Sequence, residues 1–168
     1  IKAVHLAHTD GELSDVSAFG SGATARAVTF HRSLPVYEPT PLADLKCLAA
    51  GLGLGRIAVK DESKRFGLNA FKGLGTSYSV ARYLAQYLDL PESEMTYETL
   101  QKPEYRERLR GVTLVTATDG NHGRGIAWAA KLFGLFAHVF MPKGSSTERL
   151  ANIRGLGAEA SFTTYNYD

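Results

Sequence analysis

The stretch from residue 112 to residue 163 alternates between strand and helix patterns, and this alternation narrows the possible folds more than any other feature. Its apolar runs predict three strands, at 112–117, 136–141 and 158–163. Helical patterns fill both gaps: one covers 124–133 and ends at Gly134, and the other follows the capping box of Ser145 and Glu148. Strands joined by helices in this way pair in parallel through right-handed crossovers. The sequence therefore predicts an α/β fold with a parallel sheet.

The part of the chain before residue 89 gives weaker signals. Residues 1–40 show little periodicity and are predicted to form a loop-rich arm. A short helix is predicted over 42–50, ended by a glycine-rich run, and a strand over 56–60. A longer helix is predicted from Phe71, because apolar residues recur at helical spacing on one face: Leu74, Tyr78, Ala81, Ala85 and Leu88.

Two further segments have a distinctive composition. Residues 89–111 are rich in charge and contain two prolines, so they are predicted to be a solvated insertion with a surface helix around 103–110. Residues 136–141 are almost all apolar, which is typical of a strand buried on both faces of a parallel sheet.

Composition excludes several classes of function. The 168 residues carry 19 Lys and Arg against 17 Asp and Glu, a net charge of +2, so we expect no nucleic-acid partner. No apolar run approaches the ~20 residues that span a bilayer, and the first residues lack the pattern of a secretory leader. The single cysteine, Cys47, excludes an internal disulfide framework and fits a cytoplasmic protein; we expect it to be a small buried thiol.

Most sequence motifs of known chemistry are absent. The five histidines lack metal-ligand spacing, so no metal site is expected. The glycines at 120, 123 and 125 have the wrong order for a dinucleotide fingerprint, and neither a P-loop nor a G-x-S-x-G motif occurs. Two candidates remain, namely Lys72 and the loop from Thr118 to Gly123.

Lys72 lies in the first turn of the helix predicted from Phe71. Most lysines are exposed and serve only solubility. The positive end of a helix dipole disfavours a cation, however, and so favours the neutral, nucleophilic form of an amine placed there. The glycines near Lys72 leave room for a planar ligand.

The loop Thr118-Asp119-Gly120-Asn121-His122-Gly123 lies at the carboxyl end of a predicted parallel strand and leads into a helix. Open α/β sheets bind ligands at this edge, and the free N–H groups of a helix start attract anions such as a carboxylate. Gly120 and Asn121 are also typical of an ordinary turn, and Asp119 of a helix cap, so the residues alone leave both interpretations open.

Taken together, Lys72 and this loop resemble the fold-type II pyridoxal-phosphate enzymes, the group of threonine dehydratase, serine racemase, cysteine synthase and tryptophan synthase β. A narrower resemblance, to the diaminopropionate ammonia-lyase family, covers nearly the whole chain. The segments that carry it are 65–75, 89–111, 117–125, 140–142 and 165–168.

The resemblance implies a three-layer parallel-sheet αβα fold, incomplete at the C-terminus, and pyridoxal 5'-phosphate as cofactor. Lys72 would form the Schiff base and Asn121 would contact the cofactor's phenolic oxygen. The substrate would be bound by Thr118, Asp119, Gly120, Asn121 and His122. The implied reaction is α,β-elimination of 2,3-diaminopropionate to pyruvate and ammonia, with Lys72 as base for the L-isomer and Asp119 for the D-isomer.

The resemblance also implies a domain division. Residues 1–75 would be the N-terminal part of a large cofactor domain and residues 76–168 a small α/β domain. The glycine-rich phosphate loop of the group is expected beyond residue 168, and the full-length protein is expected to be a homodimer. Two alternatives stay open: a serine or threonine dehydratase of the same fold, and a truncated, non-catalytic fragment.

Overall fold

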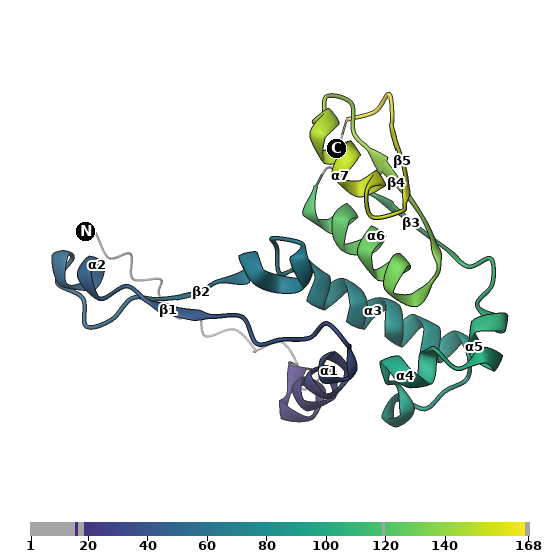
Figure 1. Ribbon diagram of the computed structural model, residues 1–168, viewed down its shortest axis with the longest axis horizontal. Helices are drawn as coiled ribbons and strands as arrows, with labels where there is room; N and C mark the ends of the chain where they lie inside the picture. Colours follow the sequence, from purple (N-terminus) through teal and green to yellow (C-terminus); the bar gives the residue numbers. More distant parts are fainter. Residues whose placement is uncertain (1–15, 17–18, 119, 167–168) are drawn as a thin grey trace.

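The predicted parallel sheet is present in the computed structural model, which describes residues 16, 19–118 and 120–166. Its strands lie in the order β3, β4, β5, with bounds Thr113–Ala117, Phe136–Met141 and Glu159–Phe162. Two helices connect them, α6 (Asn121–Phe133) and α7 (Thr147–Arg154) (Figure 1). Gly134 ends α6 with a φ of 61°, a left-handed conformation that suits glycine. The predicted alternation of strands and helices is confirmed.

Both connecting helices cover the same face of this sheet. Strand β4 directs Ala137, Val139 and Met141 toward them, and all three are buried, whereas Phe136 on the opposite face is 67% exposed. The prediction of a strand buried on both faces is therefore wrong for the described part of the chain. The physical reason is that two right-handed crossovers running in the same direction place their helices on one face.

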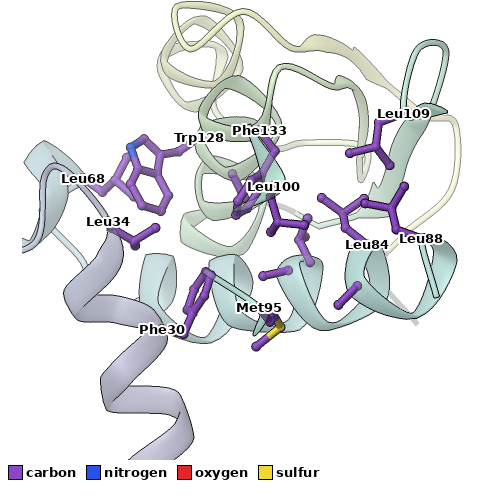
Figure 2. Packing of buried hydrophobic residues seen from close by; sticks show 14 residues of the cluster. Phe30, Leu34, Leu68, Leu84, Leu88, Met95, Leu100, Leu109, Trp128 and Phe133 are labelled. Atoms are coloured by element: carbon purple, nitrogen blue, oxygen red, sulfur yellow. The ribbon is translucent and has the colours of Figure 1, made fainter. Parts of the chain in front are cut away.

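Helix α3 (Lys72–Tyr87) packs along α6, and the main hydrophobic core lies between and around them (Figure 2). Ala81, Ala85 and Leu88 of the predicted apolar face are buried in this core, whereas Leu74 and Tyr78 are half-buried. Val80 and Leu84, which the predicted face does not include, are buried there as well. At one end of the core the ring of Trp128 stacks on Phe66 with a centroid distance of 4.5 Å. The two helices are thus held in a fixed relation, which matters because each begins at a predicted site residue.

The charged insertion at 89–111 folds into three short helical segments, η3 (Glu92–Glu94), α4 (Tyr97–Leu100) and α5 (Pro103–Arg108). Helix α5 confirms the surface helix predicted there. The segment is more than a solvated excursion, however, because Met95, Leu100 and Leu109 are buried in the main core. Its few apolar residues are spaced too irregularly to reveal this packing.

The first forty residues contain a helix that the sequence did not predict, α1 (Ser21–Ser33). Most of its residues are small or polar and its amphipathicity is weak, so its stability comes from tertiary packing rather than from local pattern. Phe30 and His31 are its buried residues, and they pack against α3 and the following segment. The prediction of a loop-rich arm is wrong over this helix.

Residues 42–60 form an arm that extends away from α3 and α6 (Figure 1). Strands β1 (Leu42–Asp44) and β2 (Ala58–Lys60) pair antiparallel, and α2 (Lys46–Gly51) lies between them. The helix predicted over 42–50 is therefore wrong at its start. Cys47 is exposed on α2, which also corrects the expectation of a buried thiol. The segment η2 (Glu62–Gly67) leads from the arm to α3.

Candidate functional site

The two predicted candidates both lie at helix starts. Lys72 is the first residue of α3 and its side chain is exposed, while Asn121 is the first residue of α6. Gly120 precedes α6 with a φ of −164° and a ψ of −128°, and His122 is exposed in the first turn. Thr118 follows β3 directly and is buried, and its backbone N–H donates to the Phe140 carbonyl at 2.9 Å. Asp119 lies outside the described residues.

A pocket of ≈ 330 Å³ lies between these helix starts. Its two walls are the first turns of α3 and α6, with Lys72 on one wall and His122 on the other. The remaining lining residues are mostly apolar or small: Phe71, Gly75, Thr76, Ser79, Val80 and Ile126. The structure therefore brings Lys72 and His122 to one cavity, whereas Thr118, Gly120 and Asn121 do not line it. An apolar pocket with a few polar groups is the usual form of a small-molecule site.

The loop before α6 lies close to the sheet because position 123 has no side chain. A Cβ at Gly123 would lie 2.9 Å from Thr118 Cγ2, 3.0 Å from Val139 Cγ1 and 3.1 Å from Ile153 Cδ1. The first separation is shorter than real Cβ contacts and the other two are tighter than most of them, so glycine is the residue that lets α6 begin this near to β4 without displacing these side chains. Gly123, one of the glycines that do not fit the dinucleotide pattern, therefore has a packing role.

The segment that delivers Lys72 has an unusual backbone. Phe66, Gly67 and Asn69 have positive φ angles of 52°, 69° and 53°. Phe66 is a bulky residue for which this left-handed conformation is costly, and such strain persists only where the surroundings impose it. The chain thus turns sharply three to six residues before Lys72, and the sequence carried no signal for this beyond Gly67 and Asn69.

An ion pair that the sequence did not predict anchors this turn. Arg65 is only 4% exposed and donates from Nε to Glu62 Oε2 at 2.9 Å. It also donates from Nη2 to Thr40 Oγ1 at 3.1 Å and from Nη1 to the Glu38 carbonyl at 2.9 Å. Hydrogen bonds from Arg65 hold the pKa of the Glu62 carboxyl at about 2, far below its ordinary value.

The first turn of α3 has a second support in His31. The ring Nε2 of His31 lies 2.9 Å from the Leu74 carbonyl oxygen, and this oxygen can only accept, so Nε2 carries the proton. Burial lowers the pKa of the His31 imidazole, which therefore stays neutral near pH 7. His31 stood in a segment predicted to be a loop, so sequence reasoning had no means to identify it.

Among the residues that the structure describes, no three His, Cys, Asp or Glu side chains gather as a metal site would need. The helices in the described ranges also include none that is long and apolar enough to cross a bilayer.

Comparison with known proteins gives consistent matches. The sequence profile of the family described as pyridoxal-phosphate dependent enzymes matches residues 34–168. A diaminopropionate ammonia-lyase of Salmonella typhimurium is 55% identical over 141 residues, which cover 84% of this chain and 35% of that protein.

Solved structures give the same result. The apo crystal structure of the Escherichia coli diaminopropionate ammonia lyase is 45% identical, with a TM-score of 0.84 over 95% of this chain and 42% of that one. The same enzyme in complex with an aminoacrylate-PLP azomethine reaction intermediate is 46% identical, with a TM-score of 0.80 over 95% of this chain and 38% of that one. The predicted fold class, a partial parallel-sheet αβα fold, is confirmed, and this chain spans less than half the length of these relatives.

Proposed function

Because the chain belongs to the family of pyridoxal-phosphate-dependent enzymes, we propose that it carries part of the active site of a diaminopropionate ammonia-lyase. The proposed reaction is the α,β-elimination of 2,3-diaminopropionate to pyruvate and ammonia. The observation that carries this proposal is the pocket shared by Lys72 and His122, in a chain 55% identical to an enzyme of that name. The activity is proposed for the protein that includes this chain, and not for these 168 residues alone.

Lys72 and the pocket residues beside it fit the part of a pyridoxal-phosphate site that binds the cofactor's aldehyde. The cofactor needs a lysine amine that is accessible from a pocket, and Lys72 is exposed in a largely apolar pocket beside Phe71 and Gly75. When bound, the cofactor's ring acts as an electron sink for the bonds that break in the substrate.

The proposed roles of the other residues follow from the resemblance to diaminopropionate ammonia-lyases. Asn121 would contact the cofactor's phenolic oxygen. Thr118, Asp119, Gly120, Asn121 and His122 would bind the substrate, with its carboxylate near the helix start, where unpaired N–H groups favour an anion. Because the Thr118 N–H already bonds to Phe140, Thr118 would contribute its hydroxyl.

Two different bases are proposed for the two enantiomers of the substrate. Lys72, once displaced from the cofactor, would take the α-proton of the L-isomer. Asp119 would take that of the D-isomer from the other side. A positioned base of this kind contributes about 10² to 10⁴ in rate.

We also propose that residues 1–75 belong to a large domain and residues 76–168 to a small one. Support comes from the arm at 42–60, which exposes many apolar side chains that a folded protein would cover. They are Leu42, Leu45, Leu48, Leu52, Leu54 and Val59. The division falls inside the first turn of α3, close to Lys72.

A homodimer, a cytoplasmic location and a small amino acid as substrate complete the proposal. The free thiol of Cys47 fits a reducing compartment such as the cytoplasm.

The test uses the longest natural chain that contains these residues. After addition of pyridoxal phosphate, we expect the absorbance of a Schiff base, and pyruvate release from diaminopropionate in preference to serine or threonine. Lys72→Ala should abolish both signals, while Lys102→Ala, at an exposed position of the insertion, should leave both unchanged. Schiff-base absorbance that survives Lys72→Ala, or faster turnover of threonine than of diaminopropionate, would reject the proposal.

A further inference from the structure

Helices α3 and α6 touch at Gly125, one turn after the start of α6. A Cβ at this position would lie 2.8 Å from Thr76 Oγ1, 3.4 Å from Thr76 Cβ and 3.5 Å from the Lys72 carbonyl oxygen. The shortest of these separations is about half an ångström below an ordinary van der Waals contact. Any side chain at Gly125 would therefore push the first turn of α3 away from α6.

Thr76 has little freedom to move aside. Its side chain is buried, and its hydroxyl donates to the Lys72 carbonyl at 2.8 Å, a bond to the residue four positions earlier. Rotation of the side chain away from Gly125 would break this bond. The contact with α6 is therefore transmitted through Thr76 to the backbone of Lys72 itself.

This contact lies between the two walls of the pocket. Thr76 lines the wall of α3 one turn after Lys72, and Gly125 lies between His122 and Ile126 on the wall of α6. The separation of the helices at Gly125 thus sets how far the amine of Lys72 lies from the loop before α6. Catalytic groups must be held within about half an ångström of their productive positions, which is the size of the displacement that a methyl group would impose.

We propose that Gly125 and Thr76 are positioning residues for Lys72, and that they fix the distance between the cofactor-binding lysine and the substrate-binding loop. This inference rests on the proposed function. Gly73 and Gly123 also mark close contacts, but neither joins α3 to α6. Gly73 meets Leu68 and Phe66, which precede α3, and Gly123 meets Thr118, Val139 of β4 and Ile153 of α7.

The test combines substitutions whose effects differ only through this contact, in the longest natural chain that contains these residues. Gly125→Ala introduces the methyl group, and Thr76→Ala removes the hydroxyl that the methyl would meet. Thr76→Val removes the hydrogen bond but keeps the volume, so it serves as the matched control. Gly51→Ala, in α2 with no atom near the added Cβ, controls for a Gly→Ala change in a helix.

The readout is the dissociation constant for pyridoxal phosphate, followed by Schiff-base absorbance at a temperature where circular dichroism finds every variant folded. We expect Gly125→Ala to weaken binding on the order of tenfold or more, and Gly51→Ala to change it less than about twofold. Adding Thr76→Ala to Gly125→Ala should restore the affinity to that of Thr76→Ala alone. Adding Thr76→Val should not.

Several outcomes would overturn the inference. One is a folded Gly125→Ala protein whose affinity is within about twofold of the unsubstituted protein. Another is equal rescue by Thr76→Ala and Thr76→Val. If Gly125→Ala alone does not fold, the Thr76→Val variant alone tests the inference. It loses the hydrogen bond to the Lys72 carbonyl, so it should bind pyridoxal phosphate more weakly than the unsubstituted protein. An unchanged affinity for pyridoxal phosphate would contradict the inference. An unsubstituted protein that gives no Schiff-base absorbance rejects the proposed function and this inference with it.

Discussion

The imidazole of His31 donates a hydrogen bond from Nε2 to the backbone carbonyl of Leu74, at 2.9 Å and across 43 residues of sequence. Leu74 lies in the first turn of α3, two residues after Lys72. Helix α1 therefore supports the start of the helix that carries the candidate lysine. The bond requires a neutral ring with its proton on Nε2, and burial lowers the pKa of His31 in a way that maintains the neutral form.

We predict that this histidine makes stability depend on pH. A base whose pKa is lower in the folded chain contributes its full stability above its unfolded pKa of 6.5 and loses it as the pH falls below that value. The free energy of unfolding should therefore decline as the pH falls below 6.5, measured by urea denaturation. His31→Gln, which can still donate to Leu74, should remove most of this decline.

The control for the His31 prediction is His122→Gln, since His122 is exposed in α6. This variant should keep the decline of the unsubstituted protein. Equal slopes in His31→Gln and the unsubstituted protein would contradict the prediction.

A second pH effect is predicted at the ion pair of Arg65 and Glu62. The pKa of Glu62 is lowered from 4.5 to about 2, chiefly by the hydrogen bonds from Arg65. A carboxyl group with a depressed pKa stabilises the fold above its unfolded pKa, and this stability is lost as the pH falls from 4.5 toward 2. Glu62→Gln should reduce the loss in this range and lower stability at pH 7 by about 1–3 kcal/mol.

The comparison for Glu62 is Glu104→Gln, which changes an exposed carboxylate of α5. Stability at pH 7 should then change by less than about 0.5 kcal/mol. The loss of stability between pH 4.5 and 2 should be the same as in the unsubstituted protein. If the two variants gave the same acid denaturation curve, Glu62 would not be the group responsible.

The contacts of His31 and Arg65 show which parts of the site the sequence does not predict. The places of Lys72 and Asn121 at helix starts follow from local signals, because helical periodicity and turn residues lie within a few positions of each. Arg65 and His31 act through partners such as Thr40 and Leu74, 25 and 43 residues away. No local pattern encodes a contact at that separation, so only the folded chain reveals it.

The same reasoning explains the errors in predicted elements. Helix α1 has few apolar residues and depends on its contacts with α3 and α4, which periodicity cannot detect. Strand β1 is three residues long and is defined by its pairing with β2. The amino-acid sequence of these three residues alone does not distinguish them from the start of the following helix. The glycines at 123 and 125 fit no dinucleotide motif in the sequence, and their close contacts in the fold explain why glycine stands there.

Gly123 gives a prediction on stability. A Cβ there would meet three side-chain atoms between 2.9 and 3.1 Å, from Thr118, Val139 and Ile153, of which Val139 and Ile153 are fully buried. Gly123→Ala should therefore destabilise the fold by about 1–3 kcal/mol, measured by thermal or urea denaturation. Gly51→Ala, made in open space, should instead leave stability unchanged or raise it by up to about 1 kcal/mol. Similar effects of the two substitutions would contradict the packing described for α6.

Asp119 gives the most specific prediction on the proposed chemistry. If its carboxylate is the base for the D-isomer, Asp119→Asn removes a proton acceptor while keeping nearly the same size and shape. Turnover of D-diaminopropionate should then fall by about 10² or more, while turnover of the L-isomer, for which Lys72 is the base, should change by less than about fivefold. The measurement is pyruvate release from each isomer with the full natural chain, together with the dissociation constant for pyridoxal phosphate, which should stay the same. Equal loss for both isomers would assign Asp119 a role in binding or folding, and unchanged turnover of the D-isomer would favour a dehydratase in which this residue is only a helix cap.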